Sequence, residues 1–275
     1  MAETINTWRY DLEDFDLLNA MSEADVISKS ACADYAKSDV PPEIDYRAWL
    51  RIEDQLPIGS CQGNSLATSG EIVIYLETGE ILQLTRMGAY IWTQELDGIN
   101  GDEGSTVRNG LNVITKGLCL EKFWTYPQRY TRQPPAPGTR QEAEANRVYS
   151  VVKFFRMTSP DDVITWVESN QGPLHIGISW LSSLSGAGPI VENYSGRSAG
   201  GHSVTIAGYK KLNGDTCPRL INSHSIRWAD KGTTLLKRRV LDGMFSARYT
   251  TMWGMTTAKG IVAPRWDYIA RPVTR

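Results

Sequence analysis

The chain has 275 residues, of which 41% are hydrophobic and 22% charged, and such a composition can bury one large core or two smaller ones. Its 29 basic and 31 acidic residues give a net charge of −2, so no strong field favours nucleic acid or an anionic membrane surface. The sequence has no basic start followed by an apolar stretch and no apolar run of about 18 residues, so we expect no secretion signal, no membrane span and a cytoplasmic protein.

The chain contains four cysteines, and their spacing excludes the common cysteine-rich frameworks. They stand at positions 32, 61, 119 and 217, in none of the paired spacings that mark zinc sites. We therefore predict no bound metal and no cofactor. Solitary cysteines in a chain of this size are mostly small buried hydrophobic residues, so a cysteine with a chemical role must be recognised from its surroundings.

The first half of the chain is predicted to be mainly helical. Apolar residues recur at helical spacing, and Gly79 and the glycine-rich segment 97–104 interrupt the pattern. Pro41-Pro42 ends the first helix, because proline disfavours helical backbone in the residue before it. We expect helices at 22–36, 61–77, 87–94 and 107–116.

The second half is predicted to be mainly β. The proline-rich segment 133–138 cannot join a helix or a central strand, so we place a boundary within 130–147. One helix begins after Ser159, which precedes a proline and two aspartates, and runs to about Asn170. Apolar or alternating runs bounded by polar turns predict strands, mostly of an antiparallel sheet, at 151–155, 174–180, 203–209 and 220–222.

Cys61 is the best candidate for a nucleophile. It follows the turn at 56–60 and stands at the predicted start of a buried helix. A helix N-terminus carries about half a positive charge, which favours a thiolate over a thiol. A nearby histidine can take the thiol proton, and a third polar group must hold the imidazole in place.

Three histidines are available as the base. His202 follows Gly200-Gly201 at the start of a predicted strand, where small residues allow a substrate to approach closely, and it is the preferred candidate. His175 lies within a predicted strand, and we interpret it as a residue of the core or cleft face. His224 lies two residues after Asn222, on the same face if the segment is extended, so we expect it beside the site.

Three local patterns resemble the papain family of cysteine peptidases. They are Gln55 six residues before Cys61, the stretch His-Ser-Val-Thr-Ile-Ala-Gly-Tyr that begins at His202, and Asn222-Ser223. His202 and Asn222 lie 141 and 161 residues after Cys61. The second separation exceeds the usual range of about 130–150 residues, which a loop insertion would explain. The resemblance extends to segments 8–15, 42–47, 101–105, 117–121 and 171–174.

The resemblance is strongest to the branch of the family found in bacteria, archaea and viruses, and it implies an α+β, papain-like fold. A helical left domain and an antiparallel β-barrel-like right domain would lie on either side of an active-site cleft. Gln55 and Cys61 fall in the helical half, and His202 and Asn222 fall in the β-rich half. The expected division is 1–41 for an N-terminal arm, 42–140 for the helical half, 141–256 for the β-rich half and 257–275 for a C-terminal extension.

The resemblance also implies a role for each site residue in peptide hydrolysis. Cys61 would attack the peptide carbonyl, His202 would take up and return the proton, and Asn222 would orient the imidazole. Gln55 and the backbone N–H of Cys61 would donate hydrogen bonds to the oxyanion. The residues expected to contact the substrate are Gly59, Gly104, Ser105, Gly177, Gly200 and Gly201.

Two of these glycines bear on specificity. Gly177 and Gly200 stand where the family's substrate pocket has side-chain walls, which predicts a roomy pocket with His175 near its mouth. Glycines that only allow strands to pack closely are an equal alternative. The expected partner is a peptide or protein substrate, with neither nucleic acid nor membrane. The N-terminal arm or the C-terminal extension offers a surface for a further protein.

Two positions depart from the family pattern. Gln62 follows the cysteine where an aromatic residue is usual, and His224 replaces a tryptophan that shields the His–Asn hydrogen bond. These changes keep open an alternative, a papain-like scaffold in a larger complex such as a viral one, with weak or no catalysis. A phage-encoded chain would act in the virion or the host cell. Amide or isopeptide hydrolysis by the same residues is a third possibility.

Overall fold

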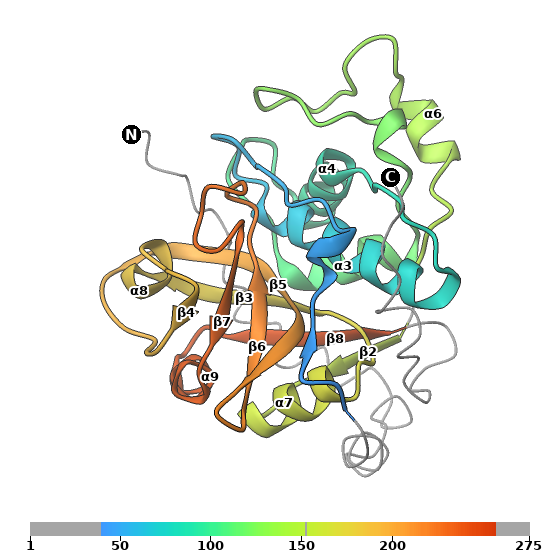
Figure 1. The fold of residues 1–275 in the computed structure, drawn as a ribbon. Coiled ribbons are helices and arrows are strands. Elements are labelled where there is room, and N and C mark those ends of the chain that lie inside the picture. The colour runs from blue at the N-terminus through green and yellow to red at the C-terminus, as the bar shows by residue number, and fades with distance from the viewer. Residues whose placement is uncertain (1–39, 152, 257–275) are drawn as a thin grey trace.

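The computed structural model describes residues 40–151 and 153–256, and these form a helical part and a sheet part that meet along one seam (Figure 1). Helices α3 (Cys61–Thr78), α4 (Arg86–Asp97) and α5 (Val107–Thr115) pack together on one side. An eight-stranded sheet lies on the other. Within the described residues, no helix has the length and apolar character needed to cross a membrane.

Helix α3 is the central element of the helical part. All its residues from 61 to 75 are buried, so protein surrounds this length of helix on every side. Gly63 lets α4 approach closely, because a Cβ at this position would lie 2.5 Å from the carbonyl oxygen of Arg86. The first turn of α3, which carries Cys61, is therefore held directly against the start of α4.

Local signals in the sequence determine where these helices begin and end. The side chains of Thr85 and Thr106 accept hydrogen bonds from the N–H groups of Gly88 and Asn109, and so cap α4 and α5. Gly98 ends α4 in the left-handed conformation, with a φ of 69°. Three predicted helices are thus confirmed, with α4 extending to Asp97. The helix predicted at 22–36 lies outside the described residues.

The sheet is built around a long central strand, β5. Its strands are β1 (Glu43–Ile44), β2 (Lys153–Arg156), β3 (Leu174–Leu181), β4 (Ile190–Val191), β5 (Ser198–Leu212), β6 (Asp215–Ile221), β7 (Thr233–Leu236) and β8 (Thr251–Thr256). Their order is β2-β8-β3-β5-β6-β7-β4, and β1 pairs with β5. Every pair is antiparallel except β4 with β7.

Helices α7 (Pro160–Glu168) and α9 (Arg238–Ser246) pack on the sheet part at its lower side in Figure 1. Ser159 caps α7 by accepting the N–H of Asp162, and Pro160 opens the helix, so the helix predicted after Ser159 is confirmed. The shorter helical elements are η3 (Tyr46–Ala48), η4 (Glu121–Phe123), α6 (Arg140–Ala145) and α8 (Ser182–Ser185).

The α+β architecture agrees with the prediction, but the barrel-like description of the β-rich half is loose. The end strands β2 and β4 do not pair, so the sheet formed by the described strands is open. The strand predicted at 220–222 begins earlier and ends at Ile221, which leaves Asn222 just beyond β6. The sequence analysis also missed β7, α9 and β8, which bring residues 233–256 into the sheet part.

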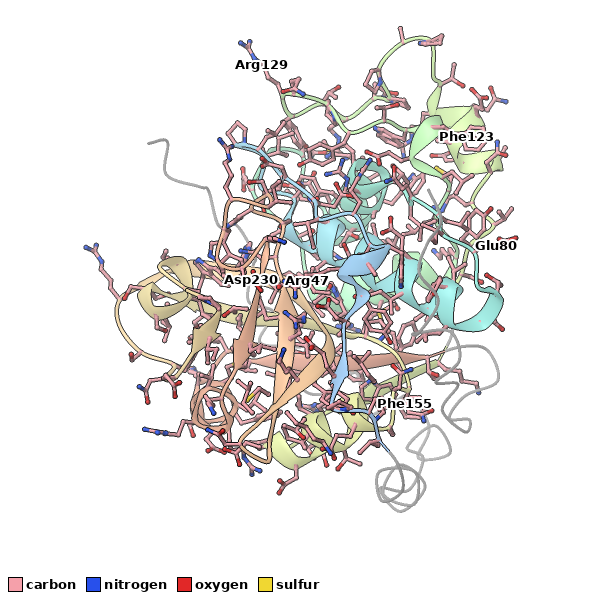
Figure 2. The ribbon with its side chains drawn as sticks, in the orientation of Figure 1. Arg47, Glu80, Phe123, Arg129, Phe155 and Asp230 are labelled. Atoms are coloured by element: carbon pink, nitrogen blue, oxygen red, sulfur yellow. The ribbon has the colours of Figure 1, made fainter. Side chains whose placement is uncertain are left out.

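Two hydrophobic clusters fill the molecule, and the chain crosses between them. Ile72 of α3 belongs to the cluster under the sheet, whereas Trp253 and Met255 of β8 belong to the helical cluster. Arg47, near the start of the described chain, donates to Asp230 of the sheet part at 2.7 Å, and Figure 2 shows the two residues side by side. The division into 42–140 and 141–256 stays a prediction.

Candidate active site

Cys61 is the first residue of α3, and it is fully buried. The residue before it, Ser60, is held by Asn64, whose Nδ2 donates to Ser60 O at 2.9 Å and to Ser60 Oγ at 3.0 Å. The first N–H groups of a helix point out of its N-terminus, where they favour negative charge. The local structure around Cys61 therefore suits an anionic sulfur and an anionic oxygen beside it.

His202 on β5 and Asn222 after β6 form a hydrogen-bonded pair. His202 Nε2 lies 2.8 Å from Asn222 Oδ1, and the N–H of Ser223 donates to the same oxygen at 2.8 Å. Because Oδ1 accepts both bonds, Nε2 carries the hydrogen, and Nδ1 of the neutral ring carries the lone pair. Nδ1 is buried and has no hydrogen-bond partner among the described residues. The ring is thus oriented to accept a proton on Nδ1.

The charge state of His202 follows from its surroundings. The pKa of His202 is lowered to about 3, mainly by burial and also by the neighbouring His224, and the hydrogen bond to Asn222 opposes this change. The imidazole is therefore neutral at pH 7 in the resting site. A neutral imidazole can act as a general base.

Aromatic rings enclose His202 on the sheet side. The ring centroid of Trp180 on β3 lies 4.5 Å from that of His202 in an edge-on arrangement, and the His224 ring lies 4.8 Å away at an angle of 38°. Trp180 also contacts His224 and Trp228, with centroids 5.8 Å apart in both pairs. His224 lies beside the site as predicted, where it shares the cover of the imidazole with Trp180.

Gln55 is held in one orientation by three hydrogen bonds. Its backbone N–H donates to Ser223 O at 2.8 Å, its Oε1 accepts the Ser223 hydroxyl at 2.7 Å, and its Nε2 donates to Ile58 O at 2.9 Å. Nε2 has two hydrogens, so one remains for another acceptor. Ser223 follows Asn222 directly, and it therefore links the candidate oxyanion donor to the residue that orients His202.

A short ladder ties the two parts of the molecule together at the site. Asp54 and His224 form an antiparallel bridge, and the N–H of Ser225 donates to Glu53 O at 2.9 Å. The segment that carries Gln55 therefore pairs along its backbone with the loop that follows Asn222.

His175 lies in a polar seam between α3 and the sheet. Its Nδ1 is 2.8 Å from Ser65 Oγ, one turn along α3 from Cys61, and Ser65 Oγ is 3.1 Å from Thr205 Oγ1 on β5. Ser69 Oγ lies 3.2 Å from the same Thr205 oxygen. His175 is fully buried, so it does not lie at the mouth of a pocket as expected. The seam holds the helix that begins at Cys61 against the strand that carries His202.

Gln62 points away from His202, as predicted for the residue after the nucleophile. Its Oε1 accepts the hydroxyl of Ser105 at 3.0 Å. Its Nε2 is buried without a partner among the described residues, and a Cβ at Gly110 would lie 1.7 Å from it. Gln62 and Ser105 therefore bind each other inside the helical part, next to a glycine that leaves room for the amide.

The remaining predicted substrate contacts lie in two places. The N–H of Gly59 donates to Asp102 Oδ1 at 2.9 Å, Tyr90 donates to the same oxygen, and the N–H of Gly104 donates to Tyr90 Oη at 3.0 Å. Gly59 and Gly104 thus flank one hydrogen-bonded unit. On the sheet, Gly177 pairs with Ser203 and Gly201 with Ser179, and Gly200 has a φ of 111°. Contact of these residues with substrate stays a prediction.

Several residues that support the site were given no role of their own in the sequence analysis. They are Arg86, Asp102, Tyr126, Trp180 and Ser223. Arg86 offered a usable signal, because it is a charged residue at the start of an otherwise largely apolar helix. Trp180 gave no such signal, since a tryptophan at the end of a strand is usually part of a core.

Cys61 stands at the N-terminus of a helix that packs against β5, and β5 carries a histidine that is hydrogen-bonded to an asparagine. This is the arrangement of a thiol hydrolase. A family model described as papain family cysteine protease matches residues 40–250. The chain belongs to the papain family of cysteine proteases. The predicted family and the predicted α+β papain-like fold are confirmed.

Relatives with known names agree with this family. Cathepsin B of Dictyostelium discoideum is 26% identical to this chain over 208 residues. The match covers 68% of this chain and 65% of the relative, so it spans just under two thirds of the relative's length. Xylellain, a cysteine protease from Xylella fastidiosa, has a TM-score of 0.70 at 20% identity, covering 93% of this chain and 97% of that one. Bromelain from Ananas comosus has a TM-score of 0.61 at 17% identity, covering 79% and 100%. These structural likenesses concern the fold.

Proposed function

We propose that this chain is a papain-like cysteine endopeptidase, with Cys61 as nucleophile, His202 as base and acid, Asn222 as the residue that orients His202, and Gln55 in the oxyanion hole. The observation that supports this most directly is the 2.8 Å bond from His202 Nε2 to Asn222 Oδ1. This bond leaves the lone pair on Nδ1 free to accept a proton. Membership of a cysteine protease family supports the same assignment.

The reaction proceeds in two stages. The Cys61 sulfur attacks the substrate carbonyl carbon as its proton passes to His202 Nδ1, and the resulting imidazolium is stabilised opposite the anion. The carbonyl oxygen becomes an oxyanion that accepts hydrogen bonds from Gln55 Nε2 and the Cys61 N–H. The tetrahedral intermediate then collapses to a thioester as His202 protonates the leaving amine. Water, deprotonated by His202, hydrolyses the thioester and releases Cys61.

The glycines at the predicted substrate pocket suggest a preference that remains to be measured. Gly177 and Gly200 place no side chain on their sides of the pocket, so we expect peptides with bulky residues before the cleaved position to be accepted. Hydrolysis of matched peptides with bulky and small residues at that position tests this. A strict preference for small residues would contradict a roomy pocket.

The scaffold alternative has no observation in its favour, because no described contact occupies His202 Nδ1 and Gln55 keeps one N–H available. Binding of a further protein through residues 1–41 or 257–275 stays a prediction, and apart from residues 40 and 41 those segments lie outside the described chain.

Labelling with an epoxide-type thiol-protease inhibitor, followed by mass mapping, tests the proposed nucleophile. The bromelain structure is a complex with the E64 inhibitor. The chain supplies its own controls, because Cys119 and Cys217 are also buried, and burial raises the pKa of Cys119 to about 12. We expect labelling at Cys61 alone, and its loss in His202→Ala. Equal labelling of Cys61 and the other cysteines would contradict the proposal.

A further inference from the structure

Arg86, the first residue of α4, belongs to a closed group of four charged side chains beside the site. Its Nη1 lies 2.8 Å from Glu53 Oε2, and its Nη2 lies 2.7 Å from Glu121 Oε1. Arg51 binds the other oxygens of the same two glutamates. The two arginines differ in exposure, since the side chain of Arg86 is 7% exposed and that of Arg51 is 40% exposed. The buried arginine is therefore matched by an exposed one with the same partners.

Arg86 makes contacts with the site that Arg51 does not make. Its Nη1 donates to Asn64 Oδ1 at 3.2 Å and lies 3.4 Å from Asp54 O. Asn64 is the residue that holds Ser60, next to Cys61, and Asp54 directly precedes Gln55. One guanidinium group therefore contacts the segment of Gln55 directly and the segment of Cys61 through Asn64.

Tyr126 gives a second connection to the same two segments. The guanidinium carbon of Arg86 lies 4.1 Å from the centre of the Tyr126 ring. The Tyr126 hydroxyl donates to Gln55 O at 2.8 Å and lies 2.5 Å from Ser60 Oγ. Because the tyrosine hydrogen goes to Gln55, Ser60 must donate to Tyr126. Arg86 thus supports the ring whose hydroxyl joins the Gln55 carbonyl to the Ser60 side chain, on either side of the oxyanion position.

The energetics of buried ion pairs favour a geometric role for Arg86. Removing charges from water costs about as much as their mutual attraction returns, so such a pair adds little net stability. Its contribution is to hold several acceptors at set positions around a planar group of donors. The acceptors held by Arg86 include groups on both sides of the candidate oxyanion hole.

We propose that Arg86 is a positioning residue for the oxyanion hole, which sets the distance between Gln55 Nε2 and the backbone N–H of Cys61. The two donors come from separate segments of chain, 54–55 and 60–61, and Arg86 contacts both through Asp54, Asn64 and Tyr126. Misplacement by about 1 Å at a reacting centre can cost about 10²-fold in rate. This inference rests on the peptidase activity proposed above.

The test compares Arg86→Gln and Arg86→Lys with Arg51→Gln, the matched control that loses the same glutamate partners. We expect kcat/KM for a peptide substrate to fall about 10- to 100-fold in Arg86→Gln, mainly through kcat. Arg86→Lys keeps the charge and the fold but cannot span the same acceptors, so it shows a smaller loss of the same kind. Arg51→Gln stays within about threefold of the parent.

Two inhibitors separate the oxyanion hole from the nucleophile. A peptide aldehyde forms an adduct whose oxygen occupies the oxyanion position, so its affinity should fall in parallel with kcat/KM in both Arg86 variants. Iodoacetamide alkylates the thiolate without forming an oxyanion, so its rate should stay within about threefold of the parent. A merely structural role would not produce this difference between the two reagents.

Three results would overturn the inference: unchanged aldehyde affinity in both Arg86 variants, an equal loss in Arg51→Gln, or an alkylation rate that falls as much as the aldehyde affinity. The parent enzyme distinguishes failure of the inference from failure of the proposed function. A parent that hydrolyses no peptide would contradict both the proposed peptidase activity and the positioning role. An active parent with unaffected Arg86 variants would contradict only the positioning role.

Discussion

The two sides of the candidate site bury different kinds of titratable group. On the helical side lie the carboxyl groups of Glu53, Glu71 and Glu121 with the guanidinium of Arg86. On the sheet side lie the three imidazoles of His175, His202 and His224, among aromatic rings and hydroxyl groups. On the helical side, Arg86 therefore keeps Glu53 and Glu121 in ion pairs, while Glu71 accepts the N–H of Leu84. The sheet side of the site has imidazoles in place of such ion pairs.

The pKa values express this difference. Burial raises the pKa of Glu71 to about 8, whereas burial lowers the pKa values of His175 and His202 to about 3 and that of His224 to about 4. The oxyanion donors thus lie next to a network of paired charges, and the base lies in an uncharged enclosure. Such an enclosure keeps the imidazole neutral until the Cys61 anion forms beside it and stabilises the protonated ring.

The largest expected effect comes from the base itself. His202→Ala should lower kcat by about 10⁴-fold or more, because the proton of Cys61 then has no acceptor. Steady-state hydrolysis of a peptide substrate measures this. His175→Asn is the matched control, since His175 is equally buried on the sheet side but bonds to Ser65. A comparable loss of kcat in folded His175→Asn would show that the two histidines do not differ in role.

A smaller loss is expected at the oxyanion donor. Gln55→Ala should lower kcat about 10²- to 10³-fold with little change in KM, because its N–H binds an oxygen that is charged only in the transition state. Gln62→Ala is the control, since Gln62 binds Ser105 inside the helical part. We expect it to change the midpoint of urea unfolding rather than kcat. A Gln62 effect on kcat as large as that of Gln55 would contradict their separate roles.

The two sides should respond to pH with opposite sign. The folded pKa of Glu71, about 8, lies above its ordinary value of 4.5, so its contribution to stability is present below pH 4.5 and is lost as pH rises toward 8. The unfolding free energy of the parent should therefore fall by roughly 2–4 kcal/mol between pH 5 and 8, and Glu71→Gln should not show this fall. Urea unfolding of both proteins at the two pH values measures this.

The histidines of the sheet side should lose stability as pH falls, which is opposite to the effect of Glu71. The folded pKa of His175, about 3, lies below its ordinary value of 6.5, so the unfolded chain takes up the proton first and stability is lost as pH falls below 6.5. His175→Asn should flatten this loss of stability below pH 6.5. It should leave unchanged the fall in unfolding free energy that Glu71 produces between pH 6.5 and 8. Equal slopes in the parent and both variants would show that neither group differs between the folded and unfolded states.

The smallest effect is expected at His224. Its ring is neutral above about pH 5, because burial lowers its pKa to about 4 even though Asp54 raises it. Below that pH a protonated His224 would repel the imidazolium that His202 forms during catalysis. His224→Phe should shift the acid limb of the kcat/KM profile to lower pH and leave activity at pH 7 within about threefold. An unchanged acid limb would show that the two rings are not coupled.

The sequence predicted those features that depend on nearby residues. The start of α7 at Ser159 and the end of α3 at Gly79 follow from capping and from glycine conformation, which act within a few residues. The start of α3 at Cys61 was predicted from the turn at 56–60, because Ser60 makes no side-chain cap. The helix missed near the C-terminal end of the described chain, α9, had no such signal, because it begins without a side-chain cap. The boundaries of the sheet depended on pairing between distant segments.

The sequence by itself determined which residues are available for chemistry at this site. Cys61, His202, Asn222 and Gln55 were each recognised from a local pattern, and a local pattern records residue type and spacing. Tertiary structure decided how they are held, through Ser223 between Gln55 and Asn222, Trp180 over His202, and Arg86 across the two oxyanion segments. These contacts join positions up to 168 residues apart in the chain. Their energies depend on burial and orientation, which exist only once the helical and sheet parts have packed together.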